Sequence, residues 1–247
     1  MSMPSYTFST PLLEGVVRHR KSRFTMDVNI NGVSFTCHCP VTGRIGNIDL
    51  SDRPCLLSKA VSFSRKTLYT VEAISLDLPD VLTKTWIGIN QNAVNRYVEH
   101  YLMNEGFSGI FSKKETITRE QILGNSKLDF LVGDTYLEIK MPLQNLQVNI
   151  PDYVNIRKVS MSSPAERFAR HITELANSLK NRQRAILMVC FVYDNPGFRV
   201  IKRRSANYEK AKAVVDNATQ AGVETWQVNF CICKYDVKLV RYFKIVV

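Results

Sequence analysis

Two patterns of hydrophobic and polar positions divide the 247-residue chain near residue 90. In the first part, residues 24–30 and 33–39 alternate between apolar and polar side chains on either side of Asn31-Gly32. This alternation predicts half-buried strands, and Asn-Gly between two strands favours a type I′ hairpin. Residues 66–74 predict a further strand. Several short strands within residues 16–77 are typical of a small closed β-barrel.

Beyond residue 90, helical and strand patterns alternate. The apolar residues 94, 97, 98, 101 and 102 have helical spacing, and residues 128–132 and 135–141 predict two strands around a Gly133-Asp134 turn. The remaining predicted elements are a helix that begins at Ser163-Pro164, a buried strand at 185–193, a helix at 206–221 and a strand-rich end from Glu224. We therefore expect an α/β chain (α+β overall), with an OB-like barrel in residues 1–85 and a second domain in residues 86–247.

The chain is strongly basic. It contains 33 Lys and Arg against 22 Asp and Glu, a net charge of +11. Both parts share the excess, which favours a polyanionic partner such as nucleic acid, although simple solubility is an alternative explanation. No apolar run is long enough to span a bilayer, the chain starts without the pattern of a secretory signal, and its six cysteines favour a reducing compartment. We therefore expect a cytoplasmic protein with no membrane partner.

The predicted hairpin carries the most informative polar residues. If Gly133-Asp134 is the turn, Val132 pairs with Thr135, and Asp129 lies opposite Glu138. Lys140 is two residues beyond Glu138 and projects from the same face. Two close carboxylates suit Mg²⁺ or Mn²⁺, and a nearby lysine can orient water or stabilise charge on a phosphate. Asp129, Glu138 and Lys140 are therefore the predicted catalytic residues, with an exposed, merely solvated hairpin face as the alternative.

Zinc and other common chemistries receive less support. Cys37 and Cys39, like Cys231 and Cys233, share a strand face without the usual zinc-ligand spacing, and buried cysteines often act as small apolar residues. The sequence contains no nucleophile elbow, Walker A motif or GxGxxG. A carbohydrate-acting enzyme with a carboxylate pair is disfavoured by the neighbouring lysine and by the basic charge.

A family resemblance extends over nearly the whole chain. Ser126-Lys-Leu-Asp129-Phe130 and Tyr136-Leu-Glu138-Ile-Lys140 resemble the core of the sugar fermentation stimulation protein A family. Other matching segments are Ser22-Arg23-Phe24, residues 39–44, 65–70, 86–90, 95–99, 167–171 and 221–224. The chain departs from the family at Val41, at Met141-Pro142 and at Asn207, all of which leave Asp129, Glu138 and Lys140 intact.

The resemblance implies a second domain of the PD-(D/E)XK nuclease type, with a mixed central sheet flanked by helices. It implies DNA binding, with RNA as a second option, and a metal-dependent nuclease. Glu99 on the first helix would then join Asp129 and Glu138 as a metal ligand, directly or through water, with an ordinary solvated glutamate as the alternative. The family name also suggests a rival function, a DNA-binding regulator of sugar metabolism without catalytic activity.

Several basic residues are expected to contact nucleic acid. Arg44 follows a glycine and could meet a phosphate from a barrel loop, whereas a plain turn is the alternative. Arg167 and His171 lie one helical turn apart and could contact a phosphate beside the metal, whereas an Arg–Glu surface pair is the alternative. The complete predicted set is Arg23, Arg44, Arg65, Lys66, Arg167 and His171. The sequence does not determine the oligomeric state, and a homodimer stays open.

Overall fold

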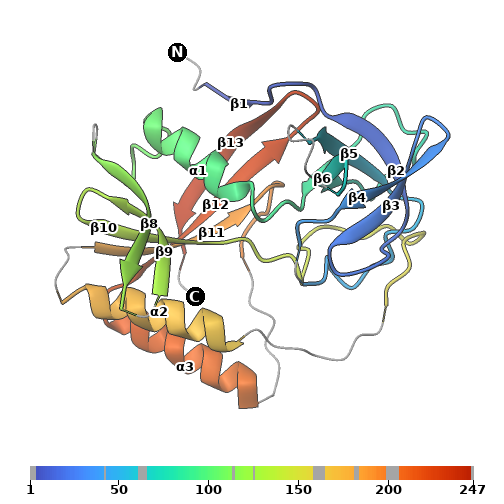
Figure 1. Cartoon of the computed structure of the whole chain (residues 1–247). Coiled ribbons are helices and arrows are strands. Elements are labelled where there is room, and N and C mark those ends of the chain that lie inside the picture. The colour runs from blue at the N-terminus through green and yellow to red at the C-terminus, as the bar shows by residue number, and fades with distance from the viewer. Residues whose placement is uncertain are drawn as a thin grey trace.

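Two β-sheets and three helices make up the computed structural model of this chain (Figure 1). The structure describes residues 4–41, 43–60, 66–112, 115–124, 126–157, 165–180, 184–198 and 206–245. It leaves the side chains of residues 165–168, 206–208 and 210–211 undescribed. Arg65 and the start of the predicted helix at Ser163 and Pro164 therefore lie outside the described residues.

The first sheet curls into a barrel. Its strands are β2 (Leu13–His19), β3 (Thr25–Ile30), β4 (Val33–His38), β5 (Pro54–Lys59) and β6 (Tyr69–Ile74). Their order is β4-β3-β2-β5-β6, and a parallel contact between His38 and Thr70 joins β4 to β6. Asn31 and Gly32 have φ values of 50° and 86°, as a type I′ turn requires. The predicted OB-like barrel is confirmed, and β7 (Ile87–Gly88) extends it beside β6.

The second sheet is mixed and has the order β1-β13-β12-β11-β10-β9-β8. Its strands are β1 (Tyr6–Thr7), β8 (Ile117–Leu123), β9 (Ser126–Val132), β10 (Thr135–Lys140), β11 (Arg184–Phe191), β12 (Glu224–Ile232) and β13 (Asp236–Lys244). β10, β11 and β12 run parallel, and the other neighbouring pairs run antiparallel. All of β11 beyond Arg184 is buried, which confirms the predicted central strand.

The helices cover both faces of this sheet (Figure 1). α1 (Val94–Met103) packs on one face, where the Tyr101 hydroxyl donates to Val237 O at 2.9 Å and accepts from Leu239 N at 2.8 Å. α2 (Ala165–Ser178) and α3 (Ala206–Gln220) lie side by side on the other face, with α2 against β9, β10 and β11. The expected α/β fold with a barrel and a helix-flanked mixed sheet is confirmed. Among the described helices, none has the length and apolar character needed to cross a membrane.

Gly88 lies where the two sheets meet. Its N–H donates to Val192 O at 2.9 Å, directly after β11. A Cβ at position 88 would lie 2.4 Å from Val192 Cγ1 and 2.5 Å from Val192 Cβ, distances that no packed side chain tolerates. The absence of a side chain at Gly88 therefore permits the close approach of the barrel to the second sheet.

We predict that Gly88→Ala destabilises the protein by about 1–3 kcal/mol, because the added methyl group forces the sheets apart. The matched control is Gly197→Ala, since a Cβ at that position meets no atom within 4 Å. We expect the control to change the free energy of unfolding by less than about 0.5 kcal/mol. Urea unfolding of both variants measures the difference, and equal stabilities would contradict the packing argument.

Candidate functional site

The predicted hairpin forms in the predicted register. Thr135 pairs with Val132, Tyr136 with Leu131 and Leu137 with Phe130. The pairing ends there, one position before Asp129 and Glu138. Asp129 Oδ2 instead accepts a hydrogen bond from Ile139 N at 2.7 Å. The Asp129 carboxylate therefore takes the place of a backbone acceptor at the point where β9 and β10 separate.

Glu138 lies in the layer beneath α2 and is only 1% exposed. Its Oε1 accepts from Lys140 Nζ, and His171 Nδ1 on α2 lies 2.5 Å from the same oxygen. Its Oε2 is buried and has no hydrogen-bond partner among the described residues. An unpaired buried carboxylate oxygen is costly, so a native protein that keeps one usually has a use for it. The alternative of a solvated hairpin face does not hold for Glu138.

Asp129 contacts the opposite helix. Asn95 Nδ2 on α1 donates to Asp129 Oδ1 at 2.7 Å, so both carboxylate oxygens have a donor. Burial raises the pKa of Asp129, and the negative charge of Glu138 raises it further, whereas the hydrogen bonds and Lys140 oppose these effects. The sequence predicted one polar face for all three residues. The structure confirms contact between Glu138 and Lys140 but places Asp129 in the gap between the strands.

Glu99 lies one turn after Asn95 on α1. Its Oε2 lies 3.4 Å from Arg119 Nη1 on β8, and the Arg119 guanidinium stacks over the Phe130 ring. Within the described part of the chain, no three His, Cys, Asp or Glu side chains are grouped closely enough to hold a metal ion. The structure thus brings Asp129 and Glu138 together and gives Glu99 a basic partner. A metal-binding role for Glu99 stays a prediction.

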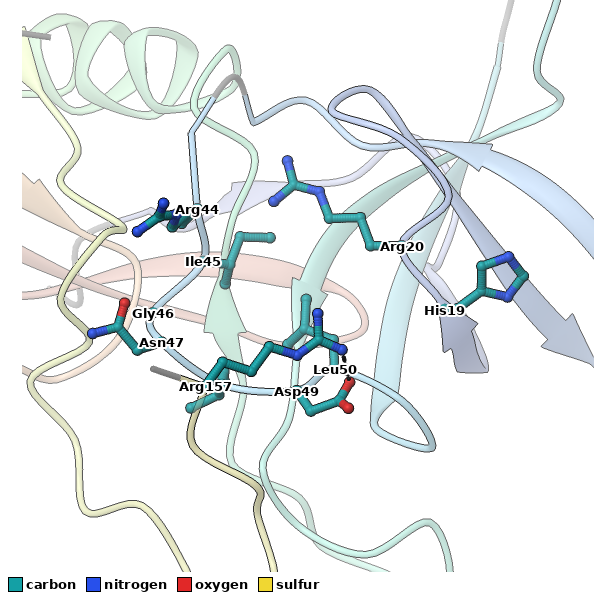
Figure 2. Close-up of a pocket in the computed structure, with 10 residues that line it drawn as sticks. His19, Arg20, Arg44, Ile45, Gly46, Asn47, Asp49, Leu50 and Arg157 are labelled. Atoms are coloured by element: carbon teal, nitrogen blue, oxygen red, sulfur yellow. Dashed lines mark ion pairs between the residues drawn. The ribbon is translucent and has the colours of Figure 1, made fainter. Parts of the chain in front are cut away.

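The residues predicted to contact nucleic acid fall into four groups. Arg23 and Lys66 are exposed on the barrel, and His171 is buried against Glu138 rather than presented to solvent. Arg44 is half-buried and lines a pocket beside the barrel (Figure 2). Arg65 lies outside the described residues, as does the side chain of Arg167.

Sequence reasoning missed three residues that the geometry singles out. Asn95 holds Asp129, while Arg20 and Arg157 line the pocket with Arg44. The sequence pattern could have identified Asn95 as a site residue, because it lies four residues before Glu99 on one flank of a predicted helix. No sequence pattern could have identified Arg157, since it reaches the barrel from a segment more than 100 positions further along the chain.

The fold and the paired carboxylates define a class: a chain with an OB-like barrel joined to a mixed α/β domain whose hairpin carries an Asp-Glu-Lys set. Two family models match this chain, one described as the SfsA N-terminal OB domain over residues 19–89 and one as the sugar fermentation stimulation protein RE domain over residues 92–236. The chain belongs to the sugar fermentation stimulation protein family.

Similar proteins cover all or nearly all of this chain. A sugar fermentation stimulation protein homolog from Synechococcus sp. (strain JA-3-3Ab) is 32% identical over 251 residues, covering 98% of this chain and 97% of the relative. A homolog from Rhizobium meliloti (strain 1021) is 28% identical over 91% of this chain and 90% of its own length. The solved structure of Pyrococcus furiosus SfsA in complex with Ca²⁺ matches all of both chains with a TM-score of 0.76 and 20% identity. That structure supports the fold.

We predict that Asp129→Asn changes how the stability of the protein depends on pH. A pKa raised on folding means that the native state binds this proton more tightly than the unfolded chain does. The contribution of Asp129 to wild-type stability therefore declines as the pH rises from about 4 through the raised pKa, and Asp129→Asn removes this decline. The stability of the variant relative to wild type should increase with pH over this range.

Urea unfolding at a series of pH values measures this effect. Asp52→Asn, which removes an exposed carboxylate paired with Arg18, is the control for the loss of one charge. A difference between Asp129→Asn and wild type that does not vary with pH would show that the environment of Asp129 is not the cause.

Proposed function

We propose that this protein binds nucleic acid and hydrolyses phosphodiester bonds with Mg²⁺ or Mn²⁺ held by Asp129 and Glu138. The observation that carries the proposal is the buried Oε2 of Glu138, which has no hydrogen-bond partner among the described residues and lies beside a second carboxylate. A divalent cation is the group best suited to such an oxygen, because carboxylates are its preferred ligands in proteins.

The donor set fits the proposed ion. Mg²⁺ is commonly held by one or two carboxylates and keeps several waters, so the site needs no third protein ligand. The Pyrococcus furiosus relative was solved in complex with Ca²⁺, another cation that prefers oxygen ligands. The arrangement of Asp129, Glu138 and Lys140 on two paired strands is also the one that a PD-(D/E)XK nuclease uses. We therefore assign the second domain to that nuclease class.

The chain's own residues have separable roles in this proposal. When bound, the cation would polarise the scissile phosphate and lower the pKa of a water molecule. Ile139 N and Asn95 Nδ2 orient the Asp129 carboxylate, and His171 fixes Glu138 from α2. The Lys140 ammonium supplies positive charge at the carboxylates, where it would stabilise charge that develops on the phosphate.

Nucleic acid is the polyanion that this family and this charge favour. The net charge of +11 attracts a phosphate backbone without regard to sequence. Arg23, Lys66, Arg65 and Arg167 stay predicted contacts, and a basic barrel beside a nuclease site would hold the substrate near the carboxylates. The six cysteines are free thiols, which supports a cytoplasmic setting for this activity.

We predict that purified wild-type protein cleaves labelled DNA or RNA only when Mg²⁺ or Mn²⁺ is present. Asp129→Asn should lower the cleavage rate by at least about a hundredfold because it weakens the metal site, and Lys140→Ala should do so because it removes charge stabilisation. Calorimetric titration with Mn²⁺ separates the two causes: Lys140→Ala should retain the metal, and Asp129→Asn should lose it.

Two residues of the same hairpin provide matched controls. Asp134→Asn alters an exposed carboxylate at the turn, and Lys127→Ala alters an exposed lysine that pairs with Glu120. Both controls should cleave at close to the wild-type rate. Cleavage that survives in Asp129→Asn and in Lys140→Ala would move the activity to another site. Nucleic-acid binding by a wild type that cleaves with neither metal would favour the regulatory alternative.

A further inference from the structure

A pocket of about 400 Å³ lies beside the barrel, and neither Asp129 nor Glu138 lines it (Figure 2). Its basic side chains come from three separate segments. His19 and Arg20 lie at the end of β2, Arg44 belongs to the loop between β4 and β5, and Arg157 belongs to the segment between β10 and α2. Apolar side chains also line it, namely Ile45, Ile48 and Leu50. This size and mixed lining are typical of sites that hold small organic ligands.

Backbone hydrogen bonds hold the segment after β10 against the barrel loop. Gly46 N donates to Leu143 O at 2.7 Å, Asp49 N to Asn155 O at 2.8 Å and Arg157 N to Asn47 O at 2.6 Å. Ile48 and Ile156 form an antiparallel bridge between the same two segments. The pocket is therefore built by the fold rather than by flexible side chains alone, and the segment that closes it begins directly after Lys140.

The charge of the pocket is unbalanced. Three guanidinium groups line it against one carboxylate, Asp49. The N–H of Ser51, with help from Arg157, lowers the pKa of Asp49 to about 2, so this carboxylate is ionised at neutral pH. Asp49 is already satisfied, because its Oδ1 accepts from the Ser51 N–H and hydroxyl and pairs with Arg157 at 2.9 Å. The pairing of Asp49 with Arg157 leaves the charges of Arg20 and Arg44 uncompensated.

Arg20 and Arg44 differ from ordinary surface arginines. Arg20 Nη2 donates to Arg23 O and to Val41 O, each at 2.8 Å, which fixes the guanidinium. The Nε of Arg20 is buried and lacks a hydrogen-bond partner within the described chain. Arg44 is half-buried, and the structure gives it no ion pair or hydrogen bond to any other described residue. Backbone carbonyls fix the guanidinium of Arg20, and neither Arg20 nor Arg44 is paired with a carboxylate among the described residues, so both planar guanidinium groups can donate to the oxygens of a phosphate.

We propose that this pocket binds the phosphate group of a nucleotide, either within a nucleic-acid strand or free as a mononucleotide. The arginines hold the phosphate, while the apolar wall and Asn47 leave room for the sugar and base. For a strand, the inference rests on the proposed function, since it assigns this pocket as a second anchoring point for the substrate. For a free nucleotide, the pocket stands independently of cleavage.

The test compares Arg44→Gln with Arg18→Gln in the full-length chain. Arg18 is an exposed arginine on the same barrel that pairs with Asp52 and does not line the pocket. Binding of labelled single-stranded oligothymidine and, separately, of labelled thymidine monophosphate is measured in EDTA, so that cleavage plays no part. Unlabelled thymidine monophosphate also serves as competitor of the oligonucleotide. Arg44→Gln should weaken oligonucleotide binding about tenfold and reduce the slope of log affinity against log salt by about one, because one phosphate contact is lost. Arg18→Gln should weaken it by less than about twofold.

The outcomes separate the two sources of phosphate. Loss of oligonucleotide binding in Arg44→Gln, without competition by thymidine monophosphate, assigns the pocket to a strand. Direct binding of labelled thymidine monophosphate by wild type that disappears in Arg44→Gln assigns it to a free nucleotide, even if oligonucleotides do not bind and the proposed function fails. Equal binding of both probes by Arg44→Gln and Arg18→Gln, or no binding of either probe by wild type, overturns the inference. Unchanged thermal unfolding of Arg44→Gln confirms that the variant is folded.

Discussion

The buried carboxylate of Glu138 is the constraint around which the second domain is organised. Transfer of an unpaired carboxylate from water into a protein interior costs several kcal/mol or more, so other side chains must pair with it there. Lys140 on the same strand and His171 on α2 both contact this carboxylate. Both contact Oε1, so the packing of α2 on the sheet and the electrostatics of the site depend on each other. A chain that needed only stability would place an apolar residue at position 138.

The connection from β10 to α2 links this site to the barrel. After Lys140 the chain does not enter α2 at once but runs along the barrel first. Gln91 Nε2 donates to Met141 O at 2.8 Å, and backbone bonds then join Leu143 and Asn155 to the barrel loop. Tyr153 continues this contact, because its hydroxyl donates to Leu76 O and its ring packs against the Arg53 guanidinium. The strand that carries Lys140 is therefore held at both ends, by sheet pairing and by the barrel.

Local features of the sequence predicted much of this fold. The Asn31-Gly32 and Gly133-Asp134 turns fix the register of two hairpins, and that register alone predicts that Asp129 lies beside Glu138. β8 escaped prediction because it is a largely exposed edge strand with Glu120 at a φ of 58°, so its apolar residues do not alternate regularly. A regular period is visible only where one face of an element is buried and the other is not.

The contacts that complete the site could not be predicted in this way. His171 meets Glu138 across 33 positions, and Asn95 meets Asp129 across 34. Such pairs depend on how helices cross the sheet, which no local pattern encodes. The same limit explains Asp129, whose side chain turns into the strand gap where ideal alternation would have pointed it to a face. Only the end of the strand pairing at Leu137 and Phe130 determines that position.

The basic side chains beside Glu138 differ from two arginines on the barrel in whether they are paired with a carboxylate. Lys140 and His171 already contact a carboxylate, so a phosphate at the hairpin would have to share their charge with Glu138. A site with two acidic side chains also repels a polyanion until a cation neutralises it. Affinity for a phosphate backbone must then come from arginines that form no ion pair with a carboxylate. Arg20 and Arg44 on the barrel meet that condition in the described chain, and the segment that begins at Met141 fixes their distance from Lys140. Under the proposed function, such a division would let the barrel hold an anionic partner while the carboxylates stay available for a metal.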